Sequence, residues 1–259
     1  MAAPWIVDDR WWSFVERLLP PHRPGRRGPV PIDDRKCLQG ILFVLFTGIG
    51  WEDLPQELGF GSGMTCWRRL RRWTDAGVFD RLHRVLLAEL NRAGELDWST
   101  AMIDAGHIRS KKGAHVWGLH PVERRRPGSK HHVACDGNGV PLAVLTTGAN
   151  VNDVTCAIEL VDAIPPIAGR PGRPRRRPDT VLADKGYDSR RVREAVQHRR
   201  ITPIIPKRGT KGIIGLGKIR WVVERTISWL HQYKRLATRW EVHTDLHNGL
   251  ISLACALIC

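Results

Sequence analysis

Apolar residues recur at helical spacing through the first third of the chain. They predict helices over about residues 5–20, 37–47, 65–76 and 79–90, and a shorter helix over 51–58. Asp33 and Thr65 are suited to cap two of these helices, and Gly48 to end one. The glycine-rich stretch 59–63 indicates a turn. The pattern therefore predicts a helical domain over residues 1–95 with a helix-turn-helix order.

After Gly94 the pattern changes to short apolar runs separated by turn signals, which is typical of strands alternating with helices. Asn152 or Asp153 can cap the first of the later helices. We expect strands over 101–103, 131–135, 141–147, 180–183 and 202–205, and helices over 153–163, 189–198, 218–233 and 246–258. This predicts an α/β domain over residues 96–259.

The predicted helix 65–76 has a basic surface. Its tryptophans and leucine, Trp67, Leu70 and Trp73, fall close to one face. A helix that docks through an apolar stripe can present cations to DNA phosphates and base edges, and the alternative is a solvated basic face without a partner. The candidate DNA-binding residues on this helix are Arg68, Arg69, Arg71 and Arg72.

Composition points to a polyanionic partner. The chain has 259 residues, 42% hydrophobic and 26% charged, which excludes collagen-like, coiled-coil and wholly disordered proteins. Its 41 Lys and Arg against 26 Asp and Glu give a net charge of +15, a property that bears on partners and not on fold. No apolar run reaches the roughly 18 residues of a membrane span, and the first residues lack the order of a signal peptide. We expect a protein inside the cell with no membrane contact.

The six cysteines are widely spread and lie mostly in apolar runs, which favours buried free thiols over a disulfide framework. His243 and His247 are four residues apart, as are Cys255 and Cys259, so a metal role for these residues stays open. The alternative is that helices at the end of the chain explain both spacings.

Two aspartates, Asp104 and Asp184, each follow an apolar strand. The carboxyl ends of parallel strands form the crevice where ligands bind, so both side chains are suited to one site. Two close carboxylates repel unless a cation lies between them, and hard divalent cations prefer oxygen ligands. Glu224 is the only acid of the predicted helix 218–233 and is the candidate for a third carboxylate.

Arg220, Glu224 and His231 share one stripe of that helix, because at 100° per residue they fall within about 40° of each other. The apolar side of the helix can then pack on the sheet with Glu224 near the aspartates and Arg220 holding it in place. Taken alone, this Arg and Glu pair is better explained as an exposed helical salt bridge worth about 0.3 to 0.5 kcal/mol, and only its combination with the two aspartates favours a site.

Four motifs, at residues 51–55, 126–132, 182–188 and 220–226, carry a family resemblance. Through them the chain resembles the DDE transposases of bacterial insertion sequences, particularly the insertion sequence five group, over nearly its whole length. The resemblance implies a ribonuclease H-like mixed sheet flanked by helices. It also implies that Asp104, Asp184 and Glu224 are a catalytic triad that binds two Mg²⁺ ions, with Mn²⁺ as a possible substitute.

The family signature around the glutamate is Tyr-x-x-Arg-x-x-x-Glu-x-x-x-x-x-x-Lys. This chain matches its Arg220 and Glu224 but has Gly217 and His231 at the other two places. The match implies that the chemistry is retained, with His231 or Lys234 replacing the lysine as a DNA contact. Gly106 stands where the family would have a hydroxyl residue. Further basic residues expected on DNA are Arg220, Lys130 and the group Arg124 to Arg126.

These observations predict an insertion-sequence transposase that binds the terminal inverted repeats of its element and target DNA. It would cleave and transfer DNA strands with bound metal and without a covalent protein intermediate. We expect an oligomer when active, and a bacterial cytoplasmic location on the DNA of the nucleoid. The alternatives are an inactive transposase-derived DNA-binding protein or regulator, and a ribonuclease H-like nuclease that cuts without joining.

Overall fold

The computed structural model describes residues 3–21, 31–111, 118–119, 127–209 and 216–259. The predicted basic group Arg124 to Arg126 and the start of the motif at 126–132 lie outside these residues.

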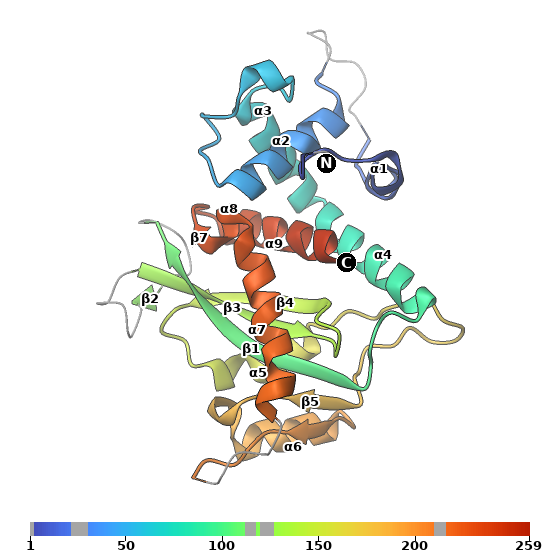
Figure 1. Cartoon of the computed structure of the whole chain (residues 1–259), viewed down its shortest axis with the longest axis vertical. Coiled ribbons are helices and arrows are strands. Elements are labelled where there is room, and N and C mark those ends of the chain that lie inside the picture. Colours follow the sequence, from blue (N-terminus) through green and yellow to red (C-terminus); the bar gives the residue numbers. More distant parts are fainter. Residues whose placement is uncertain (1–2, 22–30, 112–117, 120–126, 210–215) are drawn as a thin grey trace.

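Helices form the first part of the described chain (Figure 1). The Asp33 carboxylate accepts a hydrogen bond from the Lys36 N–H and caps α2, and Gly48 ends that helix in the left-handed region at φ 75°. Both ends of α2 are therefore as predicted. The helices are α1 (Asp9–Glu16), α2 (Asp34–Thr47), α3 (Gly63–Asp75) and α4 (Val78–Ala93).

Two predictions in this part are wrong. The segment predicted as a short helix over 51–58 forms only a 3-10 turn, Gln56–Leu58, because the residue before Pro55 is disfavoured in helical backbone. The cap of α3 is Ser62, whose hydroxyl accepts the Thr65 N–H, so the helix begins before Thr65 and not after it. A single 3-10 turn therefore stands where the first helix of the predicted pair was expected.

A mixed sheet forms the second part of the described chain. Strands β1 (Thr100–Ser110), β3 (Pro127–Cys135) and β4 (Pro141–Gly148) pair antiparallel, and β5 (Thr180–Leu182) and β6 (Thr202–Ile204) continue from β1 in parallel. The order across these strands is β4-β3-β1-β5-β6, with the short strand β2 (Gly118–Leu119) beside β3 and β7 (Thr238–Arg239) beside β1. All five predicted strands are present, and the mixed sheet confirms the predicted α/β class.

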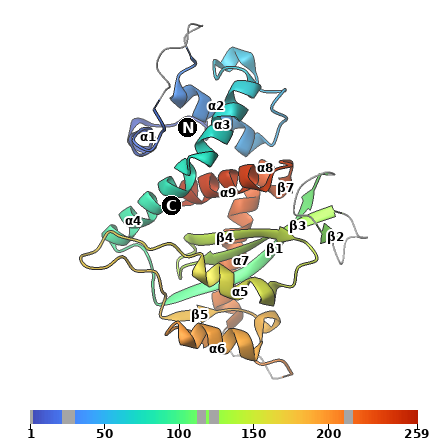
Figure 2. The ribbon, with the colours of Figure 1, turned by 180° about the vertical axis from the view of Figure 1, so that it is seen from behind.

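Helices cover both faces of this sheet. Figure 1 shows α7 crossing one face, and Figure 2 shows α5 on the other face with α6 beside β5. The side chain of Asn152 caps α5, as predicted. The later helices are α5 (Asp153–Asp162), the 3-10 turn η2 (Lys185–Tyr187), α6 (Arg190–His198), α7 (Leu216–Gln232), α8 (Lys234–Ala237) and α9 (Thr244–Ile258).

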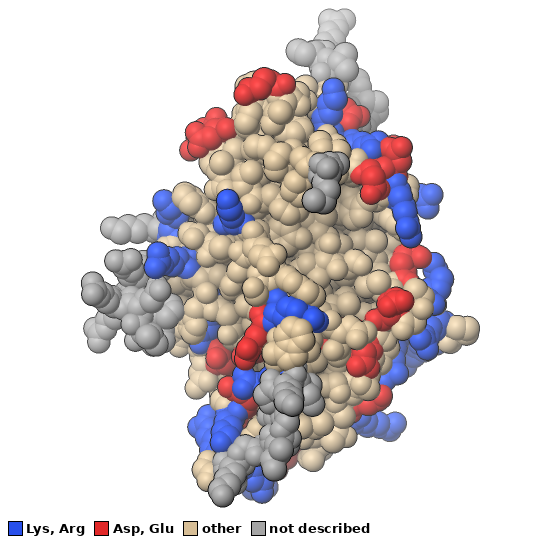
Figure 3. All heavy atoms as spheres, viewed as in Figure 1, with Lys and Arg blue, Asp and Glu red and all other residues tan. Residues whose placement is uncertain are grey.

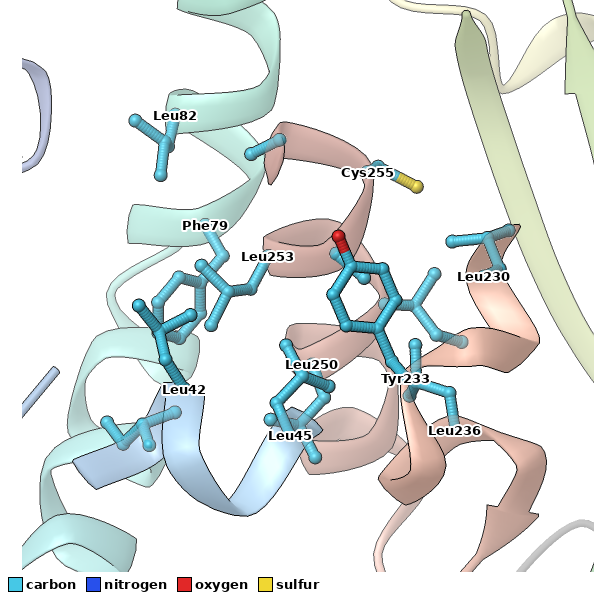
Figure 4. Packing of buried hydrophobic residues seen from close by; sticks show 14 of the residues in the cluster. Leu42, Leu45, Phe79, Leu82, Leu230, Tyr233, Leu236, Leu250, Leu253 and Cys255 are labelled. Atoms are coloured by element: carbon cyan, nitrogen blue, oxygen red, sulfur yellow. The ribbon is translucent and has the colours of Figure 1, made fainter. Parts of the chain in front are cut away.

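One hydrophobic cluster joins the two parts of the chain. Side chains of α2 and α4, such as Leu42 and Phe79, pack with Leu250 of α9 and with Tyr233 and Leu236 around the end of α7 (Figure 4). A second cluster fills the space between the sheet and α5 and α6. Because the first cluster crosses the predicted division at residues 95 and 96, that division stays a prediction.

The cysteines are free thiols as predicted, and all but Cys259 are buried. Within the described ranges, no His, Cys, Asp or Glu side chains form a group of three able to hold a metal ion, which leaves the histidine and cysteine spacing near the end of the chain without a metal site there. No helix in the described part of the chain is both long enough and apolar enough to cross a membrane.

Buried histidines make stability depend on pH. Burial lowers the pKa of His83 to about 4, despite the Asp80 carboxylate, and the pKa of His247 to about 3, where Arg239 and Arg235 add to the fall. The unfolded chain binds protons on these rings below about pH 6.5, and the folded chain does not. As the pH falls from about 6.5 to about 4, we expect each of these histidines to lower the free energy of unfolding by about 1.4 kcal/mol per pH unit.

Urea unfolding at a series of pH values between 7 and 5 measures this slope. His83 donates its Nε2 proton to the Pro141 carbonyl, at 2.8 Å, and a glutamine at position 83 keeps a donor without titrating. The slope for His83→Gln should therefore be smaller by about one histidine's share. An unchanged slope would show that His83 is not a source of the acid sensitivity.

Candidate active site

The two predicted aspartates lie close together, but only Asp184 follows its strand as predicted, because Asp104 lies within β1. Strands β1 and β5 are parallel neighbours, with Met102 opposite Leu182, and Asp104 and Asp184 each follow two residues later. The prediction that two neighbouring strands bring these carboxylates together agrees with this register. The Ala105 N–H donates to Asp104 at 2.8 Å and the Gly186 N–H donates to Asp184 at 2.7 Å, so both side chains are held by adjacent backbone.

Helix α7 brings Glu224 to the same place by crossing β1 closely. A Cβ atom on Gly106 would lie 2.7 Å from the Ile227 side chain and 3.1 Å from the His231 ring. A side chain at position 106 would push the helix away from the strand that carries Asp104. The close crossing of α7 and β1 gives a physical reason for the glycine that stands where the family resemblance predicts a hydroxyl residue.

Arg220 lies among the three carboxylates. Its Nη2 is 3.4 Å from Asp104 Oδ2, 3.7 Å from Glu224 Oε1 and 3.9 Å from Asp184 Oδ2. The sequence predicted Arg220 as a partner of Glu224, but its shortest distance is to Asp104. Figure 3 shows acidic and basic side chains next to each other on the α7 face of the molecule. The predicted triad is therefore brought together around one positive charge.

This arrangement affects the pKa of the Asp104 carboxyl. Burial raises its pKa above the usual value, and the Asp184 and Glu224 charges add to the rise. The Ala105 N–H and the Arg220 guanidinium act in the opposite direction. Its side chain is 19% exposed, against 36% for Asp184 and 61% for Glu224, so the site opens to solvent on the Glu224 side.

The chemistry of these donors fits a divalent cation. Three carboxylates that face one positive charge are the oxygen ligands that Mg²⁺ and Mn²⁺ prefer. In the described part of the chain they are not close enough together to hold a metal ion directly. Because the Arg220 guanidinium lies between them, a metal ion would have to displace it.

Most of the predicted DNA-binding arginines of α3 make contacts within the chain. Arg69 pairs with Asp34 at 2.9 Å, and Arg72 donates to the carbonyls of Pro20 and Pro21. Arg71 stacks 5.3 Å from the Trp67 ring and lies 3.9 Å from Asp245. Arg68 is exposed. Only Arg68 among the four is placed as the sequence analysis expected, because the others hold α3 to neighbouring segments.

Two further predicted DNA-binding residues, Lys130 and His231, are not fully exposed side chains. Lys130 is 6% exposed, and its Nζ donates to the Val151 carbonyl and to Asp153, both at 2.8 Å. It therefore pairs with a partly exposed carboxylate of the same chain, and its burial does not fit the predicted DNA contact. His231 is partly buried against β1 and hydrogen-bonds the ring of His131 at 3.3 Å.

Sequence analysis did not identify Tyr187 as a residue near this site. Its ring is 2% exposed, and its hydroxyl is buried without a hydrogen-bond partner. Burial raises its pKa, and the Asp104, Asp153 and Asp184 charges add to the rise. The one sequence signal was its position three residues after Asp184, within the motif at 182–188.

Two family models match the chain. The model described as the transposase DDE domain matches residues 97–259, and the model described as a putative transposase of the IS4/5 family matches residues 7–83. The chain belongs to the DDE transposase family. The family resemblance seen in the four sequence motifs is thereby confirmed.

Individual relatives agree with this assignment. A Burkholderia cepacia protein described as a putative transposase for insertion sequence element IS402 is 56% identical over 142 residues, which is 55% of this transposase and 67% of the relative. An uncharacterised 16.2 kDa protein of the same element is 50% identical over 130 residues, covering 49% of this chain and 88% of its own length.

Solved structures are more distant. A Mos1 transposase paired-end complex with the left transposon end shares 12% identity at a TM-score of 0.28, over 84% of this chain and 79% of that one. A pre-cleavage Mos1 transpososome shares 13% at a TM-score of 0.29, over 92% and 80%. Likeness at these scores says nothing further about this chain.

Proposed function

We propose that the chain is an insertion-sequence transposase that cleaves the DNA ends of its element and joins them to target DNA. The observation that carries the proposal is the meeting of Asp104, Asp184 and Glu224 around Arg220, from β1, the turn after β5 and α7, which are far apart in sequence. Isolated surface ion pairs do not need such convergence. Membership of the DDE transposase family supports the same reaction class.

In this proposal the three carboxylates hold divalent metal, Mg²⁺ or Mn²⁺. When bound, two such ions supply charge stabilisation for attacking and leaving oxygens of a phosphodiester. Asp104 and Asp184 are fixed by the backbone N–H groups of Ala105 and Gly186, so their oxygens are oriented before any ion binds. Arg220, which lies among these carboxylates, would supply a positive charge for a DNA phosphate beside the site.

The partners in this proposal are the terminal inverted repeats and the target DNA, with a second copy of the chain because two ends must be joined. The cleavage and joining reactions would take place on bacterial DNA in the cytoplasm. An inactive DNA-binding relic is less favoured, because DNA binding alone does not require three carboxylates to converge, whereas strand cleavage with bound metal does. A nuclease that cuts without joining differs only in its product.

The test is a cleavage assay on duplexes that carry the inverted repeats flanking the gene. We expect Mg²⁺-dependent nicks at the repeat ends, and joined products when target DNA is added. EDTA should stop both reactions, and duplexes with scrambled ends should stay intact. Cutting without joined products would favour the nuclease, and binding without cutting the inactive relic.

Arg68 gives a separate prediction about DNA binding. It is the exposed member of the α3 arginines, whereas Arg72 is bonded to the carbonyls of Pro20 and Pro21. Arg68→Ala should weaken binding and lower the slope of log affinity against log salt by about 0.9, the share of one phosphate. Arg72→Ala is the matched control and should leave that slope unchanged. Fluorescence anisotropy at several salt concentrations measures both.

A further inference from the structure

Three histidines form a line of imidazoles from α9 through β3 to α7. The Nε2 atom of His247 lies 2.8 Å from Nε2 of His131, and Nδ1 of His131 lies 3.3 Å from Nε2 of His231. His131 and His247 are fully buried, and His231 is partly buried. The line joins the C-terminal helix to the helix that carries Glu224.

Burial favours the neutral form of each ring in the line. Burial lowers the pKa of all three histidines, and Arg239 lowers it further at His131 and at His247. A metal ion does not explain the line, because the two ring nitrogens of His131 face different partners and one ion cannot bind both. Each ring therefore carries a single N–H.

One proton per ring gives the line a direction. His131 uses both nitrogens, so it must accept from one neighbour and donate to the other. The deciding atom is Nδ1 of His247, which is buried without a partner. A proton there would be an unpaired buried N–H, which is rarer in folded proteins than an unpaired acceptor. The favoured direction is therefore from His247 through His131 to His231.

This direction fixes the state of the last ring. Nε2 of His231 accepts the His131 proton, so the proton of His231 itself is on Nδ1. His231 lies on the stripe of α7 that carries Arg220 and Glu224. Its ring also packs against Gly106, two residues after Asp104. The line thus presents one donor on the stripe of α7 that carries Glu224, about two helical turns further along the helix.

We propose that His131 and His247 are positioning residues that hold His231 as an N–H donor to a backbone phosphate of the bound DNA. Phosphate oxygens are acceptors, and a ring whose only donor is fixed by its neighbours can meet them without rearrangement. This inference rests on the proposed function, which supplies the DNA at the site.

The first test needs no DNA. Nitrogen-15 NMR of the labelled protein distinguishes the two neutral tautomers of each histidine ring. We expect protons on Nδ1 of His131 and His231 and on Nε2 of His247. A glutamine at position 247 keeps an amide donor near Nε2 and should preserve the pattern, whereas His247→Leu should lose it. The opposite pattern in the natural protein would overturn the proposal.

The second test locates the phosphate. Duplexes with a single neutral methylphosphonate, moved step by step around the cleavage point, are compared with ordinary duplexes. His231→Ala should cut ordinary DNA roughly 10- to 100-fold more slowly, the usual loss of a hydrogen bond to a charged group. At one position the methylphosphonate should slow cleavage by the natural protein by about the same factor. At that position it should not slow cleavage by His231→Ala any further.

The variants at position 247 complete this test. His247→Leu should be slower than the natural protein, and His247→Gln should restore most of that loss. Full cleavage by His231→Ala, additive losses at every position, or equal rates for both His247 variants would each overturn the proposal. If the natural protein cuts no DNA in the presence of metal, the proposed function fails instead, and with it the DNA part of this inference.

Discussion

Asp184→Asn is expected to abolish DNA cleavage while leaving DNA binding and folding intact. A lost metal ligand removes several kcal/mol of transition-state stabilisation, which corresponds to a cleavage rate lower by roughly a thousandfold or more. Folding should change by less than about 1 kcal/mol, because the Asp184 side chain is 36% exposed and its ion pair with Arg220 spans 3.9 Å. Asparagine can also accept the Gly186 N–H that Asp184 accepts now.

The measurements are the rate of nicking at the inverted repeats, the affinity for the same duplex and the thermal midpoint. Asp179→Asn is the matched control, because Asp179 precedes β5 and its side chain is 69% exposed. This control should cut as the natural protein does. Normal cutting by Asp184→Asn would exclude Asp184 from catalysis, and loss of both cutting and binding would indicate damage to the fold.

Local patterns predicted most of the helices and strands. Helix ends depend on residues within one turn of the helix, so the local sequence predicts them. This is the case for the caps at Asp33 and Asn152 and for the helix end at Gly48. The 3-10 turn at 56–58 was not predicted because the apolar spacing runs across Pro55, and the spacing does not reflect the strain that a proline puts on a helix there. The short elements α8 and β7 were missed because four and two residues carry too little periodicity.

The candidate site was predicted in its members but not in its contacts. Alternation of apolar runs and acids indicated Asp104 and Asp184, and the parallel register of β1 and β5 then follows from the fold. The place of Arg220 between them depends on how α7 crosses β1, which the close approach at Gly106 decides. The burial of Lys130 with Asp153 is likewise a contact between distant segments, and single-sequence patterns do not contain it.

Glu241→Gln is expected to cost about 3 to 5 kcal/mol of folding stability, the usual penalty for leaving one partner of a buried ion pair alone. The Arg235 and Glu241 side chains are 5% and 7% exposed and meet at 2.7 Å. Glu241 also accepts the Trp51 indole N–H at 3.3 Å, and Arg235 donates to the Ile49 carbonyl at 2.7 Å. The pair therefore holds the segment after α2 to α8 and to the segment after β7.

Urea unfolding of Glu241→Gln against Glu89→Gln separates burial from charge. Glu89 pairs with Arg92 at 2.6 Å, but those side chains are 41% and 63% exposed, so its loss should cost about 1 kcal/mol or less. Replacing Arg235 and Glu241 together by Met and Leu should recover much of the loss, because no buried charge is then left unpaired. Equal effects of the two single substitutions would show that the Arg235 and Glu241 pair does not hold the segment after α2 to α8.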